Sequence, residues 1–496
     1  MSSVVVIGAG LAGLSAACYL TGQGHDVTVV DREDLPGGRS GLLRRDGFTF
    51  DTGPTVLTMP DLIADALRAV DSDLSALGPL KRLDPAYRAC YADGSTILVR
   101  HGREAMRQEI ADTCGSLDAA AFEDFVAWLR QLYLVEMPNF IDVNYDSPLD
   151  LLRNPLAAAK LLRLGAFRKL GSAVRSHFRD PRLHRLFSFQ AMYAGLAPEK
   201  ALALYAVITY MDSIEGVYFP EAGMHAVPLA MAQAAEKAGA QFRYGEPVTA
   251  VLRSPTGRVA GVRLGGGDAL TADAVVCTLD TPVAYEALLP ELAPPRAARP
   301  GKGDYSPSAV VWHVGVRGVP EPPVAHHNIH FGEQWDDAFD ALLERGELMP
   351  DPSRLVTIHS LDGPGLAPQG CSTLYVLEPV PNLASGKVDW RTESPALRDR
   401  LHRFLGAHGY PDEVLAEELV DPQEWQRQGM AAGTPFALAH TFRQTGPFRP
   451  PNVEKRLPGL FFAGSGTVPG VGVPMVLISG KLAAQRVAAY LPGPTR

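Results

Sequence analysis

Four residues near the N-terminus, Gly8, Gly10, Gly13 and Asp31, have the types and spacing that could hold a phosphate group and a sugar. Gly8 permits a tight turn, Gly10 lets a pyrophosphate approach the backbone, and Gly13 lets a helix pack close to a strand. The helix that follows supplies free N–H groups for the phosphate. Asp31, 18 residues after Gly13, can accept hydrogen bonds from ribose hydroxyls. This pattern predicts a nucleotide site.

The elements needed to position these residues are readable in the same stretch. Val4–Ile7 is a short β-branched apolar run, typical of a buried parallel strand. A helical segment over 14–20 ends at glycines, and 27–30 reads as the second strand, with Asp31 at its carboxyl end. Strand, turn, helix, strand and acid together make the nucleotide site a specific prediction.

Two further glycine-containing loops follow. Gly37, Gly38 and Arg39 combine a backbone that a ligand can approach closely with a forked cation for phosphate. A surface loop with a solvated arginine is the alternative. A strand over 48–52 then stops at Gly53-Pro54, where a glycine leaves room for a flat, bulky group.

Strand-like segments recur far along the chain. The sequence predicts a hairpin of 247–251 with 259–264, a buried strand over 272–280, and a strand over 459–463 that runs into small residues. An apolar helix over 476–489 follows a stretch of glycines and prolines, and its start is a second helix N-terminus.

These motifs resemble the FAD-dependent amine oxidase and carotenoid desaturase superfamily. The C-terminal stretch 464–474 is similar to the motif of bacterial and fungal phytoene desaturases, and further blocks agree at 193–198, 203–205, 215–224, 375–383, 434–436 and 448–450. The resemblance covers nearly the whole chain. It departs at Val468, where many members have histidine, and at Met475, where many have glycine.

The resemblance implies an α/β fold: a Rossmann-like FAD-binding domain of the GR2 type, a sheet-plus-helix substrate domain, and a helical lid facing a membrane. The implied boundaries are 1–75, 217–290 and 440–496 for the discontinuous FAD domain, 76–120 and 291–439 for the substrate domain, and 121–216 for the lid. The residues expected to bind FAD are Gly8, Gly10, Leu11, Ala12, Gly13, Asp31, Arg32, Gly38, Arg39, Gly53, Pro54, Thr55, Val248, Gly464, Ser465, Val473, Pro474 and Met475.

The implied activity is that of a phytoene desaturase, which forms conjugated double bonds stepwise towards neurosporene and lycopene by hydride transfer to flavin N5. Oxygen and a quinone are both open as the acceptor of the electrons from the reduced flavin. Asp150 and Arg153 align with a polar patch proposed as catalytic in related desaturases, although a helical i,i+3 ion pair is the alternative. Rival functions are a ketolase, a later-step or C30 desaturase, a non-enzymatic prenyl-binding relative such as a GDP-dissociation inhibitor, and an amine oxidase. Val468 and Met475 offer no aromatic cage for an amine.

Composition and charge exclude several classes of protein and of binding partner. The chain has 496 residues, is 46% hydrophobic and carries a net charge of −9, which excludes a disordered chain and argues against nucleic acid. Five scattered cysteines without a CxxC pair favour a reducing compartment over disulfides or zinc. The histidines of 326–330 have poor spacing for a metal and are expected in a polar strand or loop.

A basic segment predicts contact with a membrane. Residues 149–185 look helical, with nine Lys or Arg between Arg153 and Arg185. Phe167, Leu170, Val174 and Phe178 recur on one helical face, which could lie in a lipid interface, the alternative being a face packed on the core. No apolar run is long enough to span a bilayer, so the expected location is cytoplasmic and peripheral to the membrane.

Overall fold

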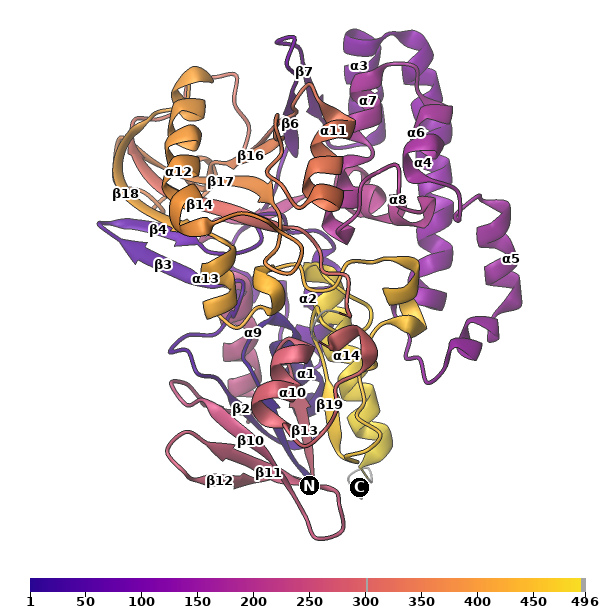
Figure 1. Cartoon of the computed structure of the whole chain (residues 1–496), viewed down its shortest axis with the longest axis vertical. Coiled ribbons are helices and arrows are strands. Elements are labelled where there is room, and N and C mark those ends of the chain that lie inside the picture. The colour runs from indigo at the N-terminus through magenta and orange to yellow at the C-terminus, as the bar shows by residue number, and fades with distance from the viewer. Residues whose placement is uncertain (300–301, 492–496) are drawn as a thin grey trace.

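A parallel sheet of five strands organises the lower half of the molecule in Figure 1. This computed structural model describes residues 1–299 and 302–491. The strand order β19-β13-β1-β2-β9 makes neighbours of segments far apart in the sequence. The strands are β1 (Ser3–Ile7), β2 (Asp26–Val30), β9 (Gln241–Arg243), β13 (Ala274–Cys277) and β19 (Leu460–Phe462).

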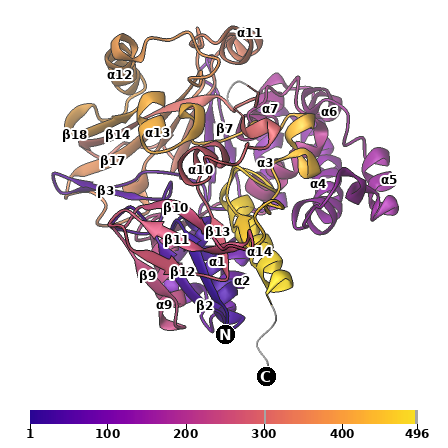
Figure 2. The ribbon, with the colours of Figure 1, turned by 60° about the horizontal axis from the view of Figure 1, so that its bottom comes forward.

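The alternation of side chains along β1 explains why this sheet is covered on both faces. Val4 and Val6 face a core shared with one group of helices, whereas Val5 and Ile7 face a second core. The first face carries α1 (Leu11–Gly22), α2 (Pro60–Arg68), α9 (Ala226–Lys237) and α14 (Val473–Tyr490). The second carries α10 (Thr281–Leu288) and the sheet of β10 (Val248–Arg253), β11 (Val259–Leu264) and β12 (Ala269–Thr271). The nucleotide-binding half therefore has three layers, visible from below in Figure 2.

A seven-stranded sheet of order β18-β14-β17-β16-β15-β6-β7 forms the upper left of Figure 1. Its strands are β6 (Tyr87–Cys90), β7 (Thr96–Val99), β14 (Ser308–Arg317), β15 (His327–His330), β16 (Arg354–Thr357), β17 (Cys371–Val380) and β18 (Glu413–Val420). Around it lie α11 (Trp335–Asp340), α12 (Trp390–Ala407) and α13 (Pro422–Arg427). Two short pairs join β3 (Leu42–Arg45) to β4 (Phe48–Asp51) and β5 (Leu80–Arg82) to β8 (Tyr218–Pro220).

Helices fill the upper right of Figure 1. They are α3 (Arg103–Cys114), α4 (Ser116–Glu136), α5 (Pro155–Arg163), α6 (Leu170–His177), α7 (Pro181–Leu186) and α8 (Ala206–Thr209). The turns between them include η2 (Met137–Ile141), η3 (Pro148–Leu152), η5 (Ala203–Tyr205) and η6 (Tyr210–Ile214), and two later turns, η11 (Phe442–Gln444) and η12 (Gly446–Phe448), lie nearby. Within the described chain, no helix is long and apolar enough to cross a membrane.

The segment 149–185 is largely helical, as its sequence predicts, but it is not one continuous helix. The segment is divided into η3, α5, α6 and α7. Two prolines set the breaks, because Pro155 and Pro181 each occupy the first turn of a new helix. The preceding residues, Asn154 and Asp180, cap those helices with their side chains.

The structure also contradicts the prediction that Phe167, Leu170, Val174 and Phe178 together face a membrane. Leu170, Val174 and Phe178 are buried in the main core, and Phe178 packs edge-on against Phe125 of α4 with ring centroids 5.0 Å apart. Of the four residues in the predicted stripe, only Phe167 is substantially exposed. Core packing, the alternative reading, therefore accounts for the apolar period, because a helix that lies over a larger helix buries the same face that a lipid surface would take.

Candidate functional site

A cavity of about 650 Å³ connects the nucleotide-binding half to the helical region. One end is bounded by the turn after β1, the Gly53–Thr55 loop and the start of α14. From there the cavity passes between the seven-stranded sheet and the helices, where apolar side chains such as Ile208, Phe331 and Leu377 form its walls. Such a lining excludes water and carries few groups that could recognise a polar ligand.

The glycine turn after β1 is built as its sequence predicts. Gly8 has φ +103°, a conformation that side chains rarely adopt. A Cβ atom added to Gly13 would lie 2.0 Å from the Gly8 carbonyl oxygen, so only glycine allows α1 to pack so close to the turn. Asp31 accepts hydrogen bonds from the backbone N–H of Ala9 at 2.6 Å and of Glu33 at 2.9 Å, which holds its carboxylate beside the turn.

Two helix N-termini open into the cavity. The N-caps of α1 and α14 are Gly10 and Gly472, neither helix start has a side-chain cap, and neither has an acid in its first turn. Gly10 and Gly472 both line the cavity. The free N–H groups and positive dipole ends of both helices therefore point at one shared cavity, which suits an anionic or electron-rich ligand.

Arg39 ties three loops together at this end of the cavity. Its guanidinium donates to Ser465 Oγ at 2.8 Å and forms an ion pair with Asp280 at 2.6 Å. Its Nε is buried and has no partner within the described residues, so one donor remains for a ligand. A Cβ on Gly53 would lie 1.7 Å from the Arg39 carbonyl oxygen, which explains the glycine there.

The buried carboxylate of Asp51 anchors the central block of the sequence to the site. It accepts hydrogen bonds from the backbone N–H of Met224 and of His225, both at 2.9 Å. The His225 ring in turn contacts the Ser40 carbonyl at 3.0 Å. Through these contacts the start of α9 supports the loop that carries Arg39.

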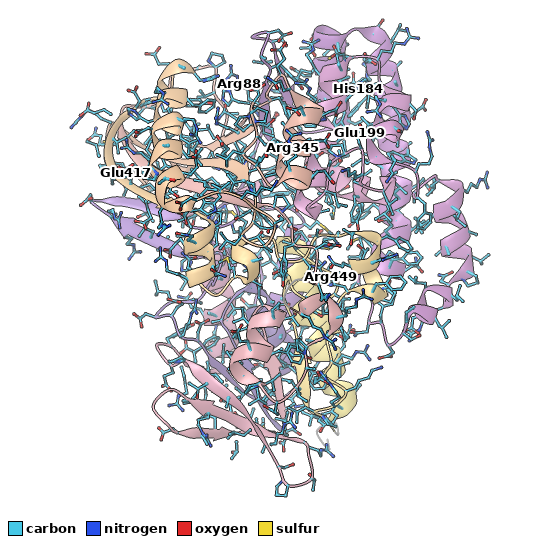
Figure 3. The ribbon with its side chains drawn as sticks, viewed as in Figure 1. Arg88, His184, Glu199, Arg345, Glu417 and Arg449 are labelled. Atoms are coloured by element: carbon cyan, nitrogen blue, oxygen red, sulfur yellow. The ribbon has the colours of Figure 1, made fainter. Side chains whose placement is uncertain are left out.

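Arg449, labelled in Figure 3, is a structural centre that sequence reasoning left without a role. It is buried, and it donates to four backbone carbonyls, those of Leu438, Gln444, Ser465 and Thr467. Burial lowers the pKa of Arg449 to about 10, which still leaves it charged at neutral pH. It fixes the Gly464–Thr467 loop against the segment before β19. Its only sequence signal is the Phe-Arg-Pro tripeptide.

The structure brings most of the predicted cofactor residues to the cavity. Those that line it are Gly10, Leu11, Ala12, Arg39, Gly53, Pro54, Thr55, Gly464, Ser465, Val473, Pro474 and Met475. Gly8, Gly13, Gly38 and Asp31 lie directly behind this lining, in the turn and the loops already described.

Two predicted residues lie farther from the cavity. Val248 begins β10, and Glu246, two residues before it, donates its N–H to the Asp31 carbonyl at 2.9 Å. This contact places the start of β10 beside the expected ribose position. Arg32 is exposed, and its guanidinium binds Glu33 and the Gln428 carbonyl.

Asp150 and Arg153 are not in the cavity lining, although Leu151 between them is. The Asp150 carboxylate caps η3 by accepting from the N–H groups of Asp146 and Ser147, and these hydrogen bonds hold its pKa below the usual range. Arg153 pairs with Asp150 at 2.9 Å and is largely exposed. A capping box and a local ion pair account for these contacts, and the catalytic role stays a prediction.

The donors at the end of the cavity formed by the turn after β1 and the start of α14 fit FAD. A glycine cradle that no side chain could replace, two uncapped helix N-termini and an arginine with an unsatisfied buried Nε are what a dinucleotide with a flat ring requires. The turn after β1 would hold the pyrophosphate, Asp31 the ribose, and the start of α14 the pyrimidine edge of the ring.

Comparison with known proteins agrees with this assignment. Residues 11–488 match the family described as flavin containing amine oxidoreductase. The chain is 49% identical over 489 residues to the phytoene dehydrogenase of Streptomyces griseus, covering 98% of this chain and 94% of that protein. It is 35% identical over 495 residues to the zeta-carotene-forming phytoene desaturase of Myxococcus xanthus, covering 98% and 94%. An oxidoreductase structure from Methanosarcina mazei shares the fold with a TM-score of 0.63 at 17% identity, covering 97% of this chain and 100% of that one.

The chain therefore belongs to the flavin-containing amine oxidoreductase family, and within it to the carotenoid desaturases of the phytoene desaturase type. Its cofactor is FAD, and it is an oxidoreductase that acts on CH–CH bonds.

Proposed function

We propose that this FAD-dependent carotenoid desaturase acts on phytoene and introduces conjugated C=C bonds stepwise towards neurosporene and lycopene. The observation that carries the proposal is the apolar cavity that begins at the cofactor site and continues between the sheet and helices. When bound, FAD supplies the hydride acceptor at its N5 atom. The names of the two relatives support phytoene as the substrate.

The protein itself positions the substrate and excludes water from the cavity. A long hydrocarbon has no polar group to hold, so its register depends on the shape of the cavity walls, and one C–C bond must lie close to the cofactor. Apolar residues along the walls, including Leu202, Ile208 and Phe331, would hold the chain by packing. The same residues exclude water from charge that develops on the polyene.

Incubation of the FAD-loaded enzyme with phytoene in liposomes tests the proposal, with pigments followed by absorbance. Growth of bands at successively longer wavelengths is the expected result. Ala158 lines the cavity, whereas its neighbour Ala159 is exposed outside it. We expect Ala158→Trp to slow turnover by at least tenfold because it fills the cavity, and the matched variant Ala159→Trp to behave as wild type. Unchanged phytoene would overturn the substrate assignment.

The same assay separates the rival readings. A C30 substrate that is converted in preference to phytoene would make the enzyme a C30 desaturase, and oxygen-containing products would make it a ketolase. Turnover of an amine would indicate an amine oxidase, and a colourless protein that binds prenyl lipid would indicate a carrier. Anaerobic reactions with and without a quinone determine whether oxygen or a quinone accepts the electrons.

We also propose that the enzyme docks peripherally on a membrane through the rim of the cavity. Leu152, Leu156 and Leu162 of η3 and α5 are 68%, 82% and 66% exposed, and Phe442 of η11 is 64% exposed. Leu151 of η3, Leu161 of α5 and Phe448 of η12 line the cavity. Exposed apolar residues beside a hydrophobic opening suit insertion into lipid, from which the substrate would enter.

The charges at the cavity rim support this surface, and not the buried face of α6, as the membrane-docking site. Lys160 and Arg163 of α5, and Arg168 just after it, are exposed, and α5 contains no acid. These cations can meet anionic headgroups while the leucines enter the acyl region.

The domain boundaries, and the assignment of 121–216 as a lid, stay predictions.

Flotation with vesicles that contain anionic lipid tests the docking. We expect Leu156→Glu to reduce the bound fraction at least tenfold, because a charge would have to enter the apolar layer. Leu117→Glu is the matched control, since Leu117 is 62% exposed at the start of α4, away from the cavity rim. Equal loss of binding by both variants would contradict docking through this rim.

A further inference from the structure

Glu136, the last residue of α4, is an acid in an otherwise apolar wall. It is 4% exposed and lines the cavity. Its Oε1 is buried without any hydrogen-bond partner within the described residues. An unpaired carboxyl is costly to bury, so the fold retains a polar group where an apolar side chain would pack with less cost.

Tyr205 and His440 link Glu136 to the loop before α14. It is close enough to Tyr205 for its charge to affect that phenol, and Tyr205 donates its O–H to the His440 carbonyl at 2.7 Å. His440 in turn packs against Gly470, where an added Cβ would lie 2.2 Å from the imidazole. Gly470 belongs to the loop between Gly464 and α14, which lines the cofactor site.

The turns after Glu136 hold it in the same place. Residues 137–141 form a wide π-helical turn that contains Pro138, and Phe140 and Ile141 of this turn also line the cavity. A few residues later, Asn144 donates to the Leu482 carbonyl of α14 at 3.2 Å. The end of α4 is thus fastened to the helix whose start faces the cofactor.

A second buried carboxyl in the cavity wall, Asp212, has a different environment. It accepts hydrogen bonds from Tyr87 at 3.1 Å and from Gln190 at 3.5 Å, and a third from Ser213. These partners occupy the Asp212 oxygens, which explains its retention as part of a buried polar network. Glu136 has no such partners, and packing alone gives no reason for it.

We propose that Glu136 is the catalytic base that takes the proton lost by the substrate at each desaturation. The inference rests on the proposed function. The hydrogen of one C–H bond of the substrate would leave with the bonding electron pair, as hydride, to the oxidised flavin. The electron pair of the neighbouring C–H bond would form the π bond of the new C=C. The proton of that second bond forms an O–H bond on Glu136, and water at the rim receives it after product release.

The surroundings of Glu136 favour this direction of transfer. Burial raises its pKa well above the usual range, so the carboxylate is a strong base when it is ionised. The charge of Glu136 acts on Tyr205 from η5, and Tyr145 and His440 line the same cavity. Burial raises the pKa of both tyrosines, which keeps them protonated, and it lowers the pKa of His440.

Anaerobic single-turnover reduction of the enzyme-bound flavin by phytoene tests the proposal over a pH series. In wild type we expect the rate to rise with pH as Glu136 ionises. Glu136→Gln is nearly isosteric with the protonated acid, and we expect it to lower the rate at least 100-fold, to flatten the pH profile and to leave KM and FAD content unchanged. Glu136→Asp, which keeps the acid, should recover part of the rate. The infrared band of a protonated buried carboxyl should weaken in Glu136→Gln without substrate.

Asp212→Asn is the matched control, because it neutralises the other buried carboxyl of the same cavity. We expect it to keep the rise of rate with pH. Flavin reduction by Glu136→Gln within threefold of wild type, or loss of the pH dependence in Asp212→Asn in place of Glu136→Gln, would overturn the assignment of the base alone. Failure of wild type to oxidise phytoene would instead overturn the proposed function, and the base with it.

Discussion

Replacement of Gly13 by alanine tests whether the turn after β1 holds the cofactor. The new Cβ would lie 2.0 Å from the Gly8 carbonyl oxygen and 3.3 Å from Val6, so the turn and α1 must separate by about 1 Å to restore an ordinary contact. Helix α1 cannot recede freely, because on its other side a Cβ at Gly480 of α14 would already lie 2.3 Å from the Ala12 carbonyl oxygen.

The close packing on both sides of α1 sets the size of the loss in stability and in FAD affinity. Overpacking in a rigid core costs about 1–3 kcal/mol of unfolding free energy. A shift of the same size in the N–H groups that would face the pyrophosphate should weaken FAD binding by about 10- to 100-fold, or roughly 1.4–2.8 kcal/mol. The deficit in stability should be larger with FAD than without it, because bound ligand stabilises the folded state according to its affinity.

Titration of the apoprotein with FAD, followed by flavin fluorescence, measures the dissociation constant, and thermal unfolding with and without FAD measures the stability. Gly266→Ala is the matched control, since Gly266 has nothing within 4 Å of an added Cβ and no positive φ. We expect the control to match wild type in both measurements. Wild-type FAD affinity in Gly13→Ala would refute the close-packing argument.

Three further predictions concern buried and capping groups. Arg449→Met should lower the unfolding free energy by about 3 kcal/mol or more, measured by urea unfolding, because four backbone carbonyls lose their donor. Burial raises the pKa of Asp212 from 3.8 to about 7, so this carboxyl favours folding below pH 4 and that contribution is lost as the pH rises to 7. Relative to Asp212→Asn, wild type should therefore lose roughly 4 kcal/mol of stability across this window, as measured by unfolding at several pH values. The catalytic prediction for Asp150 and Arg153 requires Asp150→Asn, which keeps an acceptor for the cap, to reduce kcat about 100-fold with unchanged melting temperature; an unchanged kcat would leave capping as its role.

Local sequence predicted the cofactor-binding turns well because their chemistry is confined to a few neighbouring residues. The β-branched apolar run at 4–7, the glycines at 8, 10 and 13, and the acid at 31 each specify one local geometry, and the structure has β1, α1 and β2 where expected. The hairpin around Thr256-Gly257 is likewise present as β10 and β11. These elements depend on backbone conformation and on contacts between near neighbours.

The spacing of the apolar residues in 149–185 could not by itself show whether lipid or protein covers them. Leu170 and Val174 have the spacing of an interfacial helix, yet α4 covers them. The exposed apolar residues lie instead on α5 and η11, where local sequence gives no comparable stripe. Burial depends on which helix packs over which face, and that is set by residues distant in sequence.

The sequence by itself determined the nucleotide turn, the two helix starts that face the cofactor, and the family to which the chain is similar, because these are written in short, conformationally demanding motifs. The tertiary structure alone decided that Glu136 is unpaired in a cavity wall, that Arg449 holds the loop before α14, and that α6 is covered by protein. Each of these depends on segments hundreds of residues apart being brought together, and the energy of a buried polar group is set by the neighbours that folding supplies.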